Sequence, residues 1–163
     1  MVEAIWNELS GSFSTVSWQV SGLRLVAALL LAGAVGLERE IRHKPAGLRT
    51  HMLVSLAACL FILVAQQLAS LPFGAGDAND ALRIDPLRLI EAVTAGVAFL
   101  AAGIIFTSGG KVHHVTTGAS MWLAGAIGLA CGSGQVPLAG LATAITIGVL
   151  FLVRVFEKGI GTR

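Results

Sequence analysis

Charged residues are scarce in this sequence. Asp, Glu, Lys and Arg make up 12% of the 163 residues, whereas 55% are hydrophobic and the mean hydropathy is +0.83. A soluble domain needs many more charges to cover its surface. The shortage of charge therefore excludes a soluble globular domain and indicates an integral membrane protein. The net charge of +2 gives no reason to expect a nucleic-acid partner.

Tyrosine and cysteine are also rare, whereas glycine is abundant. Tyrosine is absent, and both cysteines, Cys59 and Cys131, fall in apolar segments where we expect packing and not a disulfide. Glycine occurs 20 times, accompanied by many alanines, and small residues let helices pack closely in lipid. The sequence contains no serine–histidine or phosphate-loop pattern. We therefore expect neither an enzyme nor a resident cofactor.

Five apolar segments are long enough to cross a bilayer, which takes roughly 20 residues. These segments are 18–37, 52–71, 87–107, 115–131 and 136–153. The sequence therefore predicts an all-α bundle of five transmembrane helices over residues 18–156, followed by a cytoplasmic tail over 157–163. The preceding segment, 1–17, lacks the basic start and continuous apolar core of a signal peptide. A short helix on the membrane surface and a disordered tail both fit it.

Lysine and arginine gather in alternate connections, which predicts the orientation of the chain. They occur after the first helix, after the third helix and at the C-terminal end. The N-terminal segment and the loop 74–86 are acidic instead. We therefore expect the N-terminus outside and the C-terminus in the cytoplasm. The basic residues of the three cytoplasmic segments are Arg39, Arg42, Lys44 and Arg49, then Lys111, then Arg154, Lys158 and Arg163.

The stretch GLEREIRHKPAGLRTHMLV, residues 36–54, concentrates charge between the first two apolar segments. Topology and contact with anionic lipid account for its basic residues. Acidic residues contribute little to topology, so Glu38 and Glu40 are either solvated, ion-paired within the loop, or functional. We hypothesise a polar cluster at the cytoplasmic mouth of the bundle, in which Glu38 pairs with Arg49. The members of this cluster are Glu38, Arg39, Glu40, Arg49, Thr50 and Thr117.

A second charged group is expected near the outer interface. Arg24 and Glu91 lie at similar depths in the first and third helices, so they would neutralise each other. The members of this group are Arg24, Asp85, Arg88 and Glu91. Magnesium needs a near-octahedral shell of oxygen ligands, and the sequence places no row of carboxylates inside the spans. The candidate metal ligands are Glu38, Glu40 and Glu91, and they give a magnesium path within one monomer little support.

Small residues recur at every fourth position on three of the helices, forming ridges that favour helix association. Packing inside the bundle is the simpler interpretation. Alternatively one ridge, most readily that of the fifth helix, faces another subunit or another membrane protein. The three ridges are Ala28, Ala32 and Gly36; Ser120, Ala124, Gly128 and Gly132; and Gly140, Ala144 and Gly148.

Three blocks of the sequence resemble the MgtC/SapB family of bacterial inner-membrane proteins. They are GAVGLEREIRHKPAGLRTHMLVSLAACLF, DPLRLIEAVTAGVAFLAAGII and VTTGASMWLAGAIGLACGSG, in that order. The chain departs from the family pattern at 95–103, which is less glycine-rich, and at His114 and Val115, before the paired threonines. The resemblance implies a multi-pass protein of the bacterial inner membrane with a link to magnesium limitation. It covers the transmembrane domain alone, and we expect no cytosolic C-terminal domain in this chain.

Two functions are compatible with these features. The first is a small regulator that binds another membrane protein in magnesium homeostasis or stress adaptation. The alternative is an oligomeric transporter or channel for Mg²⁺ or another divalent cation. The expected partners are the lipid bilayer and either another membrane protein or further copies of this chain.

Overall fold

The chain forms five long helices and one short β-hairpin in the computed structural model, which describes residues 1–3, 5, 11, 15–70 and 85–160. All five helices are long and apolar enough to cross a membrane, which confirms the expected bundle. Residues 74–84 of the predicted loop and most of the segment 1–17 lie outside the described residues. The elements are α2 (Trp18–Ile41), α3 (Leu48–Ser70), α4 (Pro86–Ile104), β1 (Phe106–Ser108), β2 (Lys111–His113), α5 (Val115–Gly132) and α6 (Val136–Ile160).

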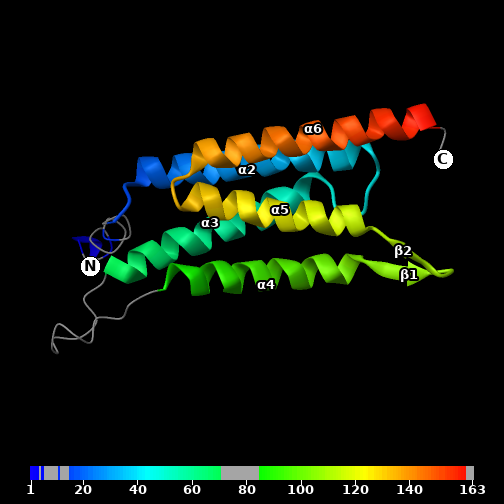
Figure 1. Cartoon of the computed structure of the whole chain (residues 1–163). Helices are drawn as coiled ribbons and strands as arrows, with labels where there is room; N and C mark the ends of the chain where they lie inside the picture. Colours follow the sequence, from blue (N-terminus) through cyan, green and yellow to red (C-terminus); the bar gives the residue numbers. More distant parts are fainter. Residues whose placement is uncertain (4, 6–10, 12–14, 71–84, 161–163) are drawn as a thin grey trace.

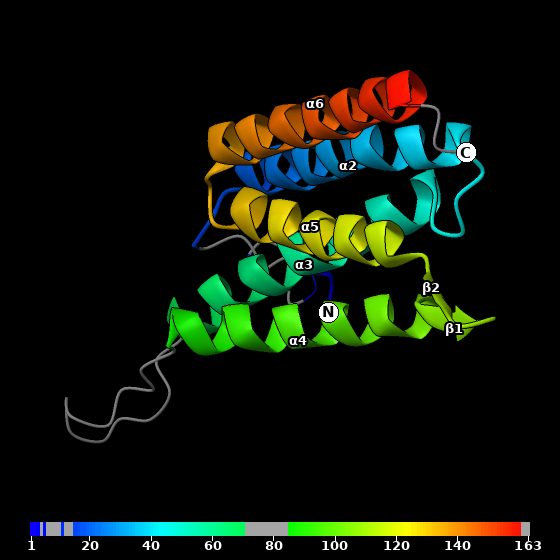
Figure 2. The ribbon, with the colours of Figure 1, turned by 45° about the vertical axis from the view of Figure 1, so that its right-hand side comes forward.

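Helix α5 is the centre of the bundle. It contacts α2, α3, α4 and α6, whereas α4 packs on α5 and α3, and α6 packs on α2 and α5. Figures 1 and 2 show α5 between the α2–α6 pair and α4. In the 18-residue apolar stretch of each helix, 56% of the residues are buried in α5, whereas 33% or less are buried in the other four helices. The most buried helix is therefore also the one with the densest run of small residues.

Glycine permits the close approach of α5 to α3. A Cβ added at Gly128 would overlap the carbonyl oxygen of Ser55, and one added at Gly132 would lie 2.7 Å from the carbonyl oxygen of Cys59. A side chain at either position would force the two helices apart. The predicted ridges of the first and fourth spans therefore pack inside the bundle, as the simpler interpretation held. All of their members are buried: Ala28, Ala32, Gly36, Ser120, Ala124, Gly128 and Gly132.

The turn between α2 and α3 is tight. The N–H of Lys44 donates to the carbonyl of Arg39 (3.1 Å), and His43 adopts a left-handed conformation with φ of 53°, which ends α2. The two helices then cross closely, because a Cβ added at Gly36 would lie 2.9 Å from the Cβ of His51. The charged stretch of the sequence is thus a compact corner and not an extended loop.

The β-hairpin was not expected. The third span was predicted to continue to residue 107, but α4 ends at Ile104 and Phe106 pairs with His113. Two consecutive glycines, Gly109 and Gly110, have φ of 58° and 73°, which is the backbone that a tight hairpin turn requires. The helix is therefore shorter than the apolar run that contains it, because the sequence after Ile104 folds back on itself.

All three basic segments lie at one end of the bundle. The α2–α3 turn, the hairpin and the C-terminal end of α6 meet on the right-hand side of Figure 1. We call this the basic end. Helix α6 extends to Ile160, so residues 157–160, predicted as part of the tail, are helical. The grouping agrees with the charge pattern of the sequence, while the orientation across a membrane stays a prediction.

Candidate functional site

The α2–α3 corner is closed by Glu40. Its carboxylate accepts a hydrogen bond from the N–H of Leu48 (3.0 Å), one of the amides at the start of α3 that has no partner within the helix. A Cβ added at Gly47 would overlap this carboxylate, so only glycine leaves room for it. A negative charge at a helix N-terminus is also favourable. Glu40 therefore acts as a cap supplied from the neighbouring helix.

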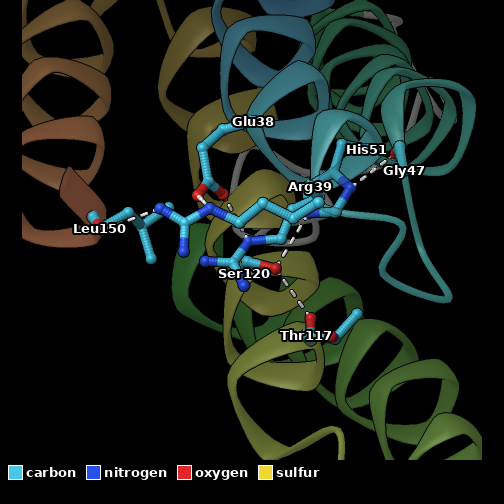
Figure 3. Close-up of polar contacts among 8 residues, drawn as sticks. Glu38, Arg39, Gly47, His51, Thr117, Ser120 and Leu150 are labelled. Atoms are coloured by element: carbon cyan, nitrogen blue, oxygen red, sulfur yellow. Dashed lines mark hydrogen bonds and ion pairs between the residues drawn. The ribbon is translucent and has the colours of Figure 1, made fainter. Parts of the chain in front are cut away.

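Glu38 is paired within its own helix. Its carboxylate contacts Nε of Arg39 at 3.0 Å and also contacts Nε of Arg42, one turn further along α2. The pair with Arg39 is a charge contact and not a well-aligned hydrogen bond. Arg42 in turn donates to the carbonyl of Leu150 in α6 (3.3 Å). Figure 3 labels Glu38, Arg39 and Leu150 at this cluster and marks the polar contacts with dashed lines. The acidic side chain thus neutralises part of a buried basic cluster.

Arg49 is not part of this cluster. The structure does not bring it to Glu38: Arg49 is exposed in the first turn of α3. The short turn does place both residues near the same end of the bundle. However, the side chain of Glu38 follows α2 toward its i+4 neighbour, a contact that helical geometry favours. We expected Glu38 to pair with Arg49, and in the structure it pairs with Arg39 and Arg42 instead.

A buried histidine links α3 to α5, and the sequence interpretation missed it. His51 is 0% exposed; its Nδ1 lies 2.8 Å from the carbonyl of Gly47 and its Nε2 lies 3.0 Å from Oγ of Ser120. Because a carbonyl only accepts, Nδ1 carries a proton. Oγ of Ser120 also lies 2.9 Å from the carbonyl of Thr117, to which it can donate. When His51 is neutral, the single hydroxyl proton of Ser120 is therefore shared between two acceptors, Nε2 of His51 and the Thr117 carbonyl. The contacts are drawn in Figure 3.

The two threonines of the predicted cluster differ in their surroundings. Thr117 is 1% exposed at the start of α5, while Thr50 is half-buried in the first turn of α3. In the described part of the chain neither hydroxyl makes the expected hydrogen bond to a free amide. Residue His114 occupies the cap position of α5 in a left-handed conformation, without a side-chain cap. The start of α5 therefore keeps free amides, whereas the start of α3 is capped by Glu40.

The outer group does not assemble. Arg24 donates to the carbonyl of Gly132 (2.8 Å) and to Oε1 of Gln66 (3.2 Å), so it caps the C-terminal end of α5. Glu91 is exposed on α4, and α4 packs on α5 and α3. The two residues that were expected to neutralise each other are therefore separate. Asp85 caps α4 by accepting from the N–H of Leu87 (2.9 Å), and Arg88 is exposed.

The candidate metal ligands are also dispersed. Glu38 contacts two arginines, Glu40 holds an amide, and Glu91 lies on another helix. Within the described ranges, no three His, Cys, Asp or Glu residues form a group that could hold a metal ion. What the basic end offers instead is positive charge, a buried imidazole and free amides. Such groups suit an anion or a protein partner better than a cation.

Several proteins are similar to this chain. "Protein MgtC" of Brucella abortus (strain 2308) is 37% identical over 130 residues, which are 80% of this chain and 50% of that protein. "Putative magnesium transporter YhiD" of Escherichia coli (strain K12) is 36% identical over 130 residues, covering 78% and 58%. "Protein MgtC" of Salmonella typhimurium (strain 14028s) is 36% identical over 132 residues, covering 81% and 52%.

The chain spans about half the length of the curated relatives it matches. No solved structure matches it. Residues 25–159 match the MgtC family, a range that includes the α2–α3 corner, the hairpin and the whole of α5. The basic end is thus built from sequence that lies within the family match. This multi-pass membrane chain belongs to the MgtC family.

Proposed function

We propose that this protein acts in the bacterial inner membrane as a regulator that binds another membrane protein through α6. It acts in magnesium homeostasis or stress adaptation and is not an enzyme. The link to magnesium rests on the name of the Escherichia coli relative and on the family. The role as a binding protein rests on one feature of the bundle, the free ridge of α6.

The third small-residue ridge faces away from the bundle. A Cβ added at Gly140 or at Gly148 would meet nothing within 4 Å, and Ala144, between them, is exposed. The other two ridges are used in packing α2, α3 and α5 together. Lipid tails are as apolar as leucine, so a small-residue groove on a free face favours another helix by close backbone approach. This ridge supports a helix–helix contact with a partner.

Leucine substitutions on α6 test this function. Gly140→Leu and Gly148→Leu fit the isolated chain but would fill the groove that a partner helix needs. Gly103→Leu on α4 is the matched control, since a Cβ there also meets nothing within 4 Å. The tagged chain should co-purify from native membranes with a stoichiometric partner that both α6 variants lose and the control keeps. Co-purification that is unaffected by both α6 variants would reject this surface.

The alternative is an oligomeric transporter for Mg²⁺ or another divalent cation. One observation favours it: Glu91 lies inside the candidate span Leu87–Ile104 and is exposed on its surface. A carboxylate that faces lipid is energetically unfavourable. In an oligomer, a neighbouring copy would cover Glu91, and its carboxylate would then line a path for the cation. Purified chain in liposomes separates the two functions. Mg²⁺ flux that Glu91→Gln abolishes would favour transport, and the absence of flux would favour the regulator.

A further inference from the structure

A cavity of about 500 Å³ opens at the basic end, between α2, α5, α6 and the hairpin. We call it the headgroup cavity. Its polar side is formed by Arg39, Arg42, Lys44, His114, Thr116 and Thr117. It is distinct from the α6 ridge, so nothing about it depends on whether the protein regulates or transports.

Arg39 provides an unusual donor to this cavity. The residue is only 3% exposed, and its ion pair with Glu38 uses Nε. Its two terminal nitrogens, Nη1 and Nη2, make no hydrogen bond among the described residues. Among the side-chain nitrogens of Arg39, only Nε is fully buried without a hydrogen bond, so the terminal nitrogens stay accessible to a ligand in the cavity. Since Arg39 lines the cavity, a ligand there would supply the missing acceptors.

The start of α5 offers further donors on the same cavity. The first hydrogen bond within this end of the helix runs from the N–H of Gly118 to the carbonyl of His114 (3.0 Å). The amides of Val115, Thr116 and Thr117 precede it and have no partner within the helix. All three residues line the headgroup cavity. A helix N-terminus directs amides and positive potential toward an anion.

The charge balance of the headgroup cavity is positive. Arg39, Arg42 and Lys44 contribute three positive charges, and Glu38, which contacts both arginines, contributes one negative charge. The carboxylate of Glu40 does not line the cavity and is held at the N–H of Leu48. The excess charge favours an anion with several acceptor oxygens, and a phosphate group has both properties.

The remaining wall of the cavity is apolar. Val149, Leu150 and Val153 of α6 line it, together with Val112 of the hairpin. A ligand that fits must therefore carry an anionic group at one side and a hydrophobic body at the other. The cavity also lies at the end of the spans, where lipid headgroups meet protein. We propose that the headgroup cavity binds the phosphate of an anionic phospholipid, held by the terminal nitrogens of Arg39 and the first amides of α5.

The test uses the full chain purified in detergent, with bound lipid measured by native mass spectrometry. Phosphatidylglycerol should be retained in preference to phosphatidylcholine, whose ammonium group cancels the phosphate charge. Arg39→Gln should weaken retention at least about tenfold, as expected for charge-assisted hydrogen bonds. Thr116→Glu changes an exposed residue and puts a carboxylate where the phosphate would lie, so it should abolish the preference in a folded chain.

Two lysines provide a matched pair. Lys44 lines the headgroup cavity, whereas Lys111 lies on β2 and does not, and both are exposed. Lys44→Gln should weaken retention about fivefold, and Lys111→Gln should leave it unchanged. If all four variants retain phosphatidylglycerol as well as the parent does, the proposed site is overturned. The melting temperature is also measured in inorganic phosphate and in chloride at equal ionic strength. If phosphate raises the melting temperature of the parent but not that of Thr116→Glu, and no lipid is preferred, the site binds free phosphate and the lipid assignment is overturned.

Discussion

Glu40 and Leu48 are joined by a hydrogen bond of 3.0 Å from the N–H of Leu48 to the Glu40 carboxylate. This contact connects the last turn of α2 to the first residue of α3. It explains why an acidic residue stands next to a turn whose basic residues alone would account for the topology. It also explains Gly47, because any side chain there would take the place of the carboxylate. The corner that positions His51 and Arg39 thus depends on an acidic side chain.

Glu40→Ala should lower the stability of the folded chain by about 1 kcal/mol, the usual effect of losing a helix cap. Glu40→Gln should cost less, since an amide oxygen still accepts from Leu48. Thermal unfolding in detergent would measure both. Arg49→Ala serves as the control, because that residue is exposed and outside the cluster. An equal loss in the control would assign the effect to general loop charge and not to the cap.

Gly128→Ala should destabilise by about 1–3 kcal/mol, since its Cβ would overlap the Ser55 carbonyl and force α5 from α3. Gly103→Ala should be neutral or stabilising by up to about 1 kcal/mol, because nothing lies within 4 Å and alanine is the better helix former. Melting temperatures of the two variants provide the comparison. Equal melting temperatures would show that the helices are not as close as the structure places them.

His51 and Ser120 should be energetically coupled. Ser120→Ala removes the partner of a buried ring nitrogen, which should cost about 1–3 kcal/mol. After His51→Leu that nitrogen is gone, so the same serine change should cost clearly less. A double-mutant cycle on unfolding would therefore give a coupling energy above about 0.5 kcal/mol. Additive effects would mean that the hydrogen bond between α3 and α5 contributes no stability.

Arg24 and Glu91 should behave independently, contrary to the pairing that their similar depth suggested. Arg24→Ala should destabilise, because it removes the donor to the Gly132 carbonyl and uncovers the turn at Gly134. Glu91→Ala should have little effect on the stability of the isolated chain. The double variant should equal the sum of the two within about 0.5 kcal/mol. A larger coupling would place Glu91 beside Arg24 after all.

The length of the apolar segments was sufficient to predict the five helices, and the spacing of small residues predicted the ridges that pack inside the bundle on the first and fourth spans. The partners of the charged residues were not predictable in the same way. Three arginines lie near Glu38 in the sequence, and in the structure Glu38 pairs with Arg39 and Arg42 and not with Arg49. The hairpin carried a readable signal, the pair Gly109 and Gly110. It was overlooked because the neighbouring run is apolar enough to continue a helix.

His51 also had a local signal, because a histidine stands in the first turns of a mostly apolar helix. Its partner Ser120 is 69 residues away, and no local pattern connects them. Local sequence signals were therefore sufficient to predict the helices. Contacts between distant segments, such as the one between His51 and Ser120, could not be predicted without knowing how α5 packs against α3. The same holds for the headgroup cavity, whose lining comes from four separate elements.

The last prediction concerns the orientation of the bundle. Because the α2–α3 turn and the hairpin lie at the same end, reporters inserted after Lys44 and after Gly109 should report the same side of the membrane. A reporter enzyme that is active only outside the cytoplasm should be silent at both positions and active after Asp77, as the distribution of basic residues requires. Cell fractionation would confirm that all three fusions reach the membrane. Activity after Lys44 with silence after Asp77 would reverse the orientation and place the headgroup cavity at the outer leaflet.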